Sequence, residues 1–145
     1  MGNSHRAILA FDYGLSQIGV AAGNTLIGTA QPITVLKARD GVPDWQAVQR
    51  LLEEWRPQLL LVGDPLHMDG TISELSGRAR KFARRLQGRS GLPVEMADER
   101  LSSVAAKEAL RALGHRGDFK REPADGIAAQ LILQTWLAEN PGSRD

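Results

Sequence analysis

Residues 6–14 read Arg-Ala-Ile-Leu-Ala-Phe-Asp-Tyr-Gly, and this stretch decides the expected fold. Its short apolar run predicts a strand that is buried on both faces of a sheet. The run stops at residues 12–14, where Asp, Tyr and Gly form a turn signal. With a period of two, Ile8, Ala10 and Asp12 share one face. The sequence therefore places an acid at the end of a buried strand.

Two more β-type runs, 18–22 and 26–36, follow this strand and are separated by Gly23-Asn24. Gly-Asn between such runs is a hairpin signal. We therefore expect the chain to open with three strands that are antiparallel neighbours.

The hydrophobic period then changes to that of alternating helices and strands. Asp44 is a candidate N-cap for a helix that Pro57 ends, and residues 71–74 (Thr-Ile-Ser-Glu) match a capping box. The remaining expected elements are strands 59–63 and 93–97, a helix from the capping box to about Gln87, a helix 101–113, a polar basic loop 114–121, and a last helix from Pro123 to about Ala138. This order predicts an α/β fold, in which a mixed sheet carries helices on both faces and the helix-connected strands are parallel.

Length and composition fit one soluble domain spanning residues 1–145, because a domain usually has ~100–200 residues. There is no Cys, which excludes disulfides, thiolate metal sites and cysteine nucleophiles. No apolar run approaches the ~18 residues of a membrane span, and no signal peptide is visible, so we expect a cytoplasmic protein. The formal net charge of +1 is a sum over segregated acids and bases, and therefore does not exclude a nucleic-acid partner.

Acids interrupt the apolar segments at three places, namely Asp12, the Asp98-Glu99 pair and Asp125. Asp125 lies in the first turn of the last expected helix, on the face of Ala128, Ala129 and Ile132, which should pack on the sheet. Taken singly, these acids could end turns or strands, or favour a helix dipole. Together they predict a carboxylate cluster at one sheet edge. Such a cluster suits Mg²⁺ or Mn²⁺, which can activate water for phosphodiester hydrolysis.

Basic residues gather in one helix and one loop. Arg78, Lys81, Arg85 and Arg89 fall within a narrow arc of the helix that begins near residue 74, and no acid occurs between Ser76 and Pro93. The loop 114–121 adds cations close to Asp125, namely Arg116, Lys120 and Arg121. Both groups could neutralise the phosphates of a nucleic acid, or could simply be solvated surface. Few aromatic residues accompany them, so base stacking is not expected.

Four motifs in order resemble the YqgF/RuvX family. They are Phe11-Asp12-Tyr13-Gly14 followed by Ile18-Gly19-Val20-Ala21; the central loop 62–71 (Val-Gly-Asp-Pro-Leu-His-Met-Asp-Gly-Thr); the run 98–103 (Asp-Glu-Arg-Leu-Ser-Ser); and the closing helix 125–134. The resemblance covers about residues 7–137. Members are described as Holliday-junction-resolvase-like proteins and as nucleases of pre-16S ribosomal RNA.

This resemblance implies a ribonuclease-H-like fold with a mixed five-stranded sheet. It also implies a metal-dependent nuclease site at Asp12, Glu99 and Asp125, with Asp98 as a substitute or helper. Arg100 would orient a carboxylate or contact phosphate, unless it forms a structural salt bridge. Two positions depart from the family pattern: Asp64 replaces an apolar residue and His67 replaces Asn. Asp64 could enlarge the metal site or face solvent, and His67 suits a hydrogen-bonding loop residue.

The resulting hypothesis is a metal-dependent endonuclease that processes the 5′ end of pre-16S ribosomal RNA in ribosome biogenesis. Its expected partners are nucleic acid, with precursor RNA preferred over branched DNA, and ribosomal precursor particles; no membrane partner is expected. A Holliday junction resolvase is the alternative within the same class, although junction cutting normally needs two symmetric sites and the expected state is a monomer or weak homodimer. A non-catalytic RNA-binding factor is the rival from another class.

Overall fold

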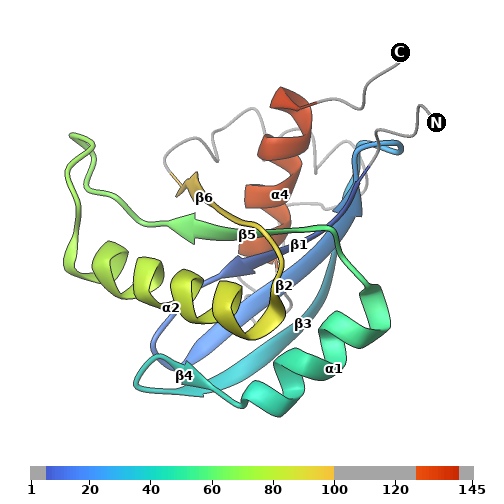
Figure 1. Ribbon diagram of the computed structural model, residues 1–145. Coiled ribbons are helices and arrows are strands. Elements are labelled where there is room, and N and C mark those ends of the chain that lie inside the picture. The colour runs from blue at the N-terminus through green and yellow to red at the C-terminus, as the bar shows by residue number, and fades with distance from the viewer. Residues whose placement is uncertain (1–5, 100–126, 141–145) are drawn as a thin grey trace.

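The computed structural model describes residues 6–99 and 127–140. The elements in these ranges are β1 (Ala7–Asp12), β2 (Gln17–Asn24), β3 (Ala30–Arg39), β4 (Val42–Pro43), α1 (Trp45–Trp55), β5 (Leu59–Asp64), α2 (Glu74–Ser90), β6 (Val94–Asp98) and α4 (Ile127–Glu139). Figure 1 shows the strands side by side in one twisted sheet, with the order β4-β3-β2-β1-β5-β6.

Strand β1 lies at the centre of this sheet. It pairs antiparallel with β2 and parallel with β5, which in turn pairs parallel with β6. Leu9, Ala10 and Phe11 have no solvent exposure, as expected for a strand covered on both faces. Because β1, β5 and β6 run in the same direction, their carboxyl ends meet at one edge of the sheet.

Helices cover the two faces of the sheet separately (Figure 1). Helices α1 and α2 pack on one face, where Phe11, Val62 and Phe82 belong to one buried cluster. Helix α4 packs on the other face, where Ala10, Leu61 and Leu133 belong to a second cluster. Alternate residues of β1 and β5 therefore point to different helices, which sets the face that each terminal side chain occupies.

The mixed sheet with helices on both faces confirms the expected α/β architecture, with two corrections. The described residues form six strands and not five, because Val42–Pro43 pairs with the end of β3. The third strand begins at Ala30 and not at Leu26, because Gly28 has a positive φ of 79° and turns the chain. Leu26 and Ile27 are consequently exposed, at 70% and 67%.

The N-caps of the helices confirm one prediction and show that another is wrong. Asp44 caps α1, since its carboxylate accepts a hydrogen bond from the Gln46 N–H at 3.0 Å. Helix α2 is capped by Ser73 and not by Thr71, whose hydroxyl donates to Asp69 at 2.7 Å, and the helix runs on to Ser90 rather than Gln87. The expected helix 101–113 and loop 114–121 lie outside the described residues.

Helix α4 is attached to the edge of β3 by two glutamine side chains. Gln134 accepts from the Ala30 N–H at 3.1 Å and donates to the Gly28 carbonyl at 3.0 Å, and Gln130 donates to the Ala30 carbonyl at 2.9 Å. Ala129 and Ile132 are buried as expected, whereas Ala128 is exposed. Across residues 6–99 and 127–140, no helix has the length and hydrophobicity to span a membrane.

Replacing Gln134 by Ala should lower the free energy of unfolding by about 1–3 kcal/mol, because the Ala30 N–H and the Gly28 carbonyl lose a partner. Urea denaturation measures the change. The matched control is Gln87→Ala, which removes an exposed glutamine of α2 and should shift the free energy by less than about 0.5 kcal/mol. Equal effects of the two substitutions would contradict this role of Gln134.

Candidate active site

Acidic side chains gather at the edge where β1, β5 and β6 end. Asp12 is the last residue of β1, Asp64 ends β5, Asp98 ends β6 and Glu99 follows it. Figure 1 shows these three strand ends pointing to the same side of the molecule. The sheet alternation divides the four acids between the two faces, so they do not form a single cluster.

Asp12 and Glu99 are joined directly on the α4 face of the sheet. The Glu99 carboxyl group donates a hydrogen bond to the Asp12 carboxylate. Burial raises the pKa of Glu99 to about 8, and the hydrogen bond and negative charge of Asp12 add to this rise. Burial also raises the pKa of Asp12, against the lowering effect of the hydrogen bond from Glu99. At neutral pH the two groups therefore share one proton.

Glycine at position 63 makes room for Glu99. A Cβ atom built on Gly63 would lie 2.7 Å from Glu99 Oε1 and 2.7 Å from Ile132 Cδ1. Both distances are too short for a real contact, so a side chain at position 63 would force the Glu99 or Ile132 side chain, or both, to move. Glu99 thus lies directly over the backbone of β5, between that strand and α4.

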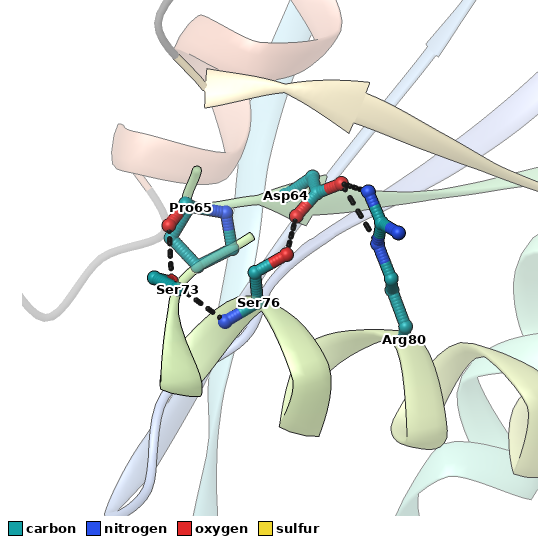
Figure 2. A network of polar contacts seen from close by, with 5 residues as sticks. All are labelled: Asp64, Pro65, Ser73, Ser76 and Arg80. Atoms are coloured by element: carbon teal, nitrogen blue, oxygen red, sulfur yellow. Dashed lines mark hydrogen bonds and ion pairs between the residues drawn. The ribbon is translucent and has the colours of Figure 1, made fainter. Parts of the chain in front are cut away.

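Asp64 belongs to a different arrangement on the α2 face. The residue is only 3% exposed, and its carboxylate accepts hydrogen bonds from Ser76 Oγ, Arg80 Nε (3.1 Å) and Arg80 Nη2 (2.8 Å). Figure 2 shows these contacts, together with Ser73, which caps α2 and donates to the Pro65 carbonyl at 2.6 Å. Asp64 therefore does not face solvent, as one alternative expected; it fixes the end of β5 to α2.

Asp98 lies opposite Asp64 in the β5–β6 ladder. Val94 and Met96 pack on the α1/α2 side, so alternation puts Asp98 on that side too. Of the two adjacent acids, Glu99 is the one bonded to Asp12. Asp98 acts on it through its charge, which contributes to the raised pKa of Glu99.

The basic residues expected to bind nucleic acid are described only in part. Arg78, Lys81 and Arg85 lie on α2 and line a cavity of about 240 Å³ beside Tyr13. Arg78 forms an ion pair with Asp40 at 3.2 Å. Asp125, Arg100, Arg116, Lys120 and Arg121 lie outside the described residues.

A family model described as "RuvX: Holliday junction resolvase" matches residues 6–139. The chain belongs to the RuvX family. This membership agrees with the resemblance carried by the four sequence motifs, and the match covers both the Asp12–Glu99 pair and α4.

Two relatives of the RuvX chain are more than half identical to it. A protein of Chromohalobacter salexigens is 56% identical over 93% of this chain and 91% of its own length. A protein of Azotobacter vinelandii is 54% identical over 94% of this chain and 96% of its own length. Both carry the name "Putative pre-16S rRNA nuclease".

Solved structures of resolvases share the fold of this RuvX chain. Thermus thermophilus RuvC in complex with a Holliday junction substrate has a TM-score of 0.54 and 17% identity, covering 94% of this chain and 98% of RuvC. The fowlpox virus resolvase bound to Holliday junction DNA has a TM-score of 0.54 and 14% identity, covering 92% and 97%. At these identities the likeness concerns the fold.

Sequence reasoning missed two features of this RuvX site. The first is the requirement for glycine at position 63, for which the only signal was a Gly at the end of a fully apolar run. The second is the Asp64–Arg80 ion pair, which crosses from β5 to α2. Within the described ranges, no group of three or more His, Cys, Asp or Glu residues is arranged to hold a metal ion.

The substitution Glu99→Gln should change how stability depends on pH. In the folded state the pKa of Glu99 is about 8, above its ordinary value of 4.5, so the folded protein holds a proton that the unfolded chain releases. Wild-type stability should therefore fall as pH rises from about 4.5 to about 8, and Glu99→Gln should remove part of that fall. Melting temperatures measured from pH 5 to 8 with EDTA present test this; parallel curves for both proteins would refute it.

The substitution Gly63→Ala should lower the free energy of unfolding by about 1–3 kcal/mol, because the added methyl group overlaps Glu99 and Ile132. Its matched control is Gly88→Ala in α2, where an added Cβ would meet nothing within 4 Å. That control should stabilise the protein by up to about 1 kcal/mol, since Ala favours helix over Gly. Chemical denaturation measures both, and a tolerated Gly63→Ala would contradict the close approach.

Proposed function

We propose that this chain is a divalent-metal-dependent endonuclease that hydrolyses phosphodiester bonds at the 5′ end of pre-16S ribosomal RNA. The observation that supports it most is the half-buried Asp12–Glu99 carboxyl pair at the ends of β1 and β6. The names of the relatives in Chromohalobacter and Azotobacter support the choice of substrate. The active compartment would be the cytoplasm.

The residues present fit a divalent cation. Two adjacent carboxylates that are shielded from water repel each other, and a positive charge between them stabilises the pair. Here a shared proton supplies that positive charge. Oxygen ligands of this kind suit Mg²⁺ or Mn²⁺. When bound, the cation would polarise the phosphodiester and lower the pKa of the attacking water.

Asp12 and Glu99 would be two of the ligands, and Asp125 the third. Asp125 precedes Ile132 by seven residues in the sequence, and Ile132 is the α4 residue that borders Glu99 and Gly63. Glu99 would lose its proton on metal binding and keep its position, because Gly63 and Ile132 confine it. Arg100, Arg116, Lys120 and Arg121 would contact the substrate phosphates.

A purely RNA-binding factor is disfavoured by the same pair. Burying two adjacent acids costs stability, and carboxylates facing phosphates weaken binding. Such an arrangement is typical of a catalytic site, where burial and neighbouring charges shift the pKa values of the reacting groups. An RNA-binding factor without catalytic activity would gain nothing from the Asp12–Glu99 pair.

A Holliday junction resolvase is the second candidate. It is supported by the description of the matching family and by the fold shared with RuvC. Symmetric cutting of a four-way junction would require two copies of the site related by a two-fold axis. Precursor RNA is preferred as substrate because the relatives with more than half of their residues identical carry that name.

Cleavage of a pre-16S RNA fragment with Mg²⁺ or Mn²⁺ tests the proposal. Asp12→Asn and Glu99→Gln should each lower the rate about 10²–10³-fold, the size of loss seen when one preorganised electrostatic group is removed from a catalytic site. EDTA should abolish wild-type cleavage. The matched control is Glu95→Gln on β6, which bonds Trp136 at 3.4 Å and should retain activity.

Four-way junction DNA serves as the second substrate in the same assay. Metal-dependent cutting of the junction with intact RNA would select the resolvase. RNA binding without cleavage in every protein would overturn both nuclease assignments.

A further inference from the structure

The cavity lined by Arg78, Lys81 and Arg85 of α2, called the groove below, lies at the same end of the molecule as the Asp12–Glu99 pair. Tyr13 follows Asp12 directly but belongs to the α1/α2 core, on the opposite face of the sheet. It lines the cavity of about 240 Å³ together with Gly41, Trp45 and Phe82. Figure 1 shows the end of β1 and the β3–β4 turn on the same side of the molecule as the other strand ends. A polymer passing round the end of β1 would therefore reach this groove.

The wall formed by α2 carries a row of cations. Arg78, Lys81, Arg85 and Arg89 recur every three or four residues, so successive charges are about one turn, ~5.4 Å, apart along one face. Lys81 and Arg85 are exposed and have no ion-pair or hydrogen-bond partner among the described residues. No acid occurs in the sequence between Ser76 and Pro93 to offset them. The row therefore suits a chain of phosphates.

The opposite wall is held rigidly against α2. The Tyr13 hydroxyl donates to the Gly41 carbonyl at 3.1 Å, and Arg78 Nη2 donates to the Asp40 carbonyl at 2.8 Å. Gly41 has a φ of +82°, and a Cβ there would overlap the Tyr13 hydroxyl at 1.9 Å. Asp40, the acid that lines this rim among residues 6–99 and 127–140, is already paired with Arg78. The groove is therefore preformed, and two of its cations are left for a ligand.

The aromatic residues of the groove are not available for stacking. The Trp45 ring lies between Phe82, at 5.7 Å between ring centroids, and the Arg89 guanidinium, 4.4 Å from the ring centroid. Phe82 and Tyr13 are buried, at 3% and 6%. Since none of these three described rings is open to a base, the groove would contact a polynucleotide through its phosphates, without a base preference.

We propose that this groove binds a single-stranded segment of polynucleotide that continues from the bond cut at the Asp12–Glu99 pair, holding it by its phosphates through Lys81 and Arg85. This inference rests on the proposed function for the position of the cut. The cavity is small and bounded on two sides by α2 and the β3–β4 turn, which suits one flexible strand better than a duplex. The ligand class is therefore a single-stranded segment of RNA or DNA, which is offered in the test as the tail of a hairpin.

Fluorescence anisotropy with EDTA present tests the groove without cleavage. The probes are a labelled RNA hairpin with a single-stranded tail of about eight nucleotides, the same hairpin with a blunt end, and a DNA hairpin with the same tail. The double variant Lys81→Gln/Arg85→Gln should bind both tailed probes about 5- to 30-fold more weakly. Its slope of log K against log salt should be smaller by about 1.4, the value for two phosphate contacts to a single strand. Binding of the blunt hairpin should not change.

The matched control is Arg84→Gln. Arg84 is an exposed arginine of α2 that lies with Arg80 and Gln87 and does not line the groove. It should alter binding of none of the three probes. Equal weakening of tailed and blunt probes, weakening by Arg84→Gln of the same size, or no weakening by the double variant would each overturn the proposal. Because the assay needs no metal, its result stands apart from the outcome of the cleavage assay.

Discussion

The close approach of Glu99 to the backbone of β5 constrains the rest of the candidate site. Glu99 fits only because position 63 has no side chain, and α4 must lie close enough for Ile132 to border the same space. The parallel pairing of β1 with β5 and of β5 with β6 then brings Asp12 to Glu99 at the sheet edge. The core on both faces of β1 is what holds these strands in register.

Because strand side chains alternate between the two faces of the sheet, the neighbouring acids make different contacts. Asp12 and Glu99 share a proton on the α4 face, whereas Asp64 is held by Ser76 and Arg80 on the α2 face. Removing Arg80 alone would leave a buried negative charge near Glu99, because the charge of Asp64 already acts on it. The Asp64–Arg80 ion pair thus fixes the end of β5 to α2 and reduces the negative electrostatic potential at this edge of the sheet.

Much of the fold was predictable because its signals are local. Apolar runs and turn residues located β1 and β5, and Asp44 capped its helix as expected. The start of β3 was not predictable from hydrophobicity, because Leu26 and Ile27 belong to a turn whose shape depends on a positive φ at Gly28. Strand β4 was missed because two residues are too few to give a periodic pattern.

The placement of acids at the sheet edge was predictable because it depends on where strands end, whereas the contacts that these acids make across the fold were not predictable. The positions of Asp12 and Glu99 follow from the apolar runs that precede them. The choice between Glu99 and Asp98 needed the register of β6 against β5. The partner of Asp64 lies 16 residues away on another element, and no local pattern signals such a pair.

The attachment of α4 has a consequence for the order in which the parts of the protein fold. Gln134 bonds to Ala30 across 104 residues of chain, whereas β1, β2 and β3 pair through short connections. Contacts between distant residues form late, because closing a long loop costs entropy before any contact offsets it. Before α4 docks, a chain whose strands β1, β2 and β3 already pair therefore lacks the Ile132 side chain beside Gly63 and Glu99. The carboxyl pair reaches its final surroundings only when α4 has packed on the sheet.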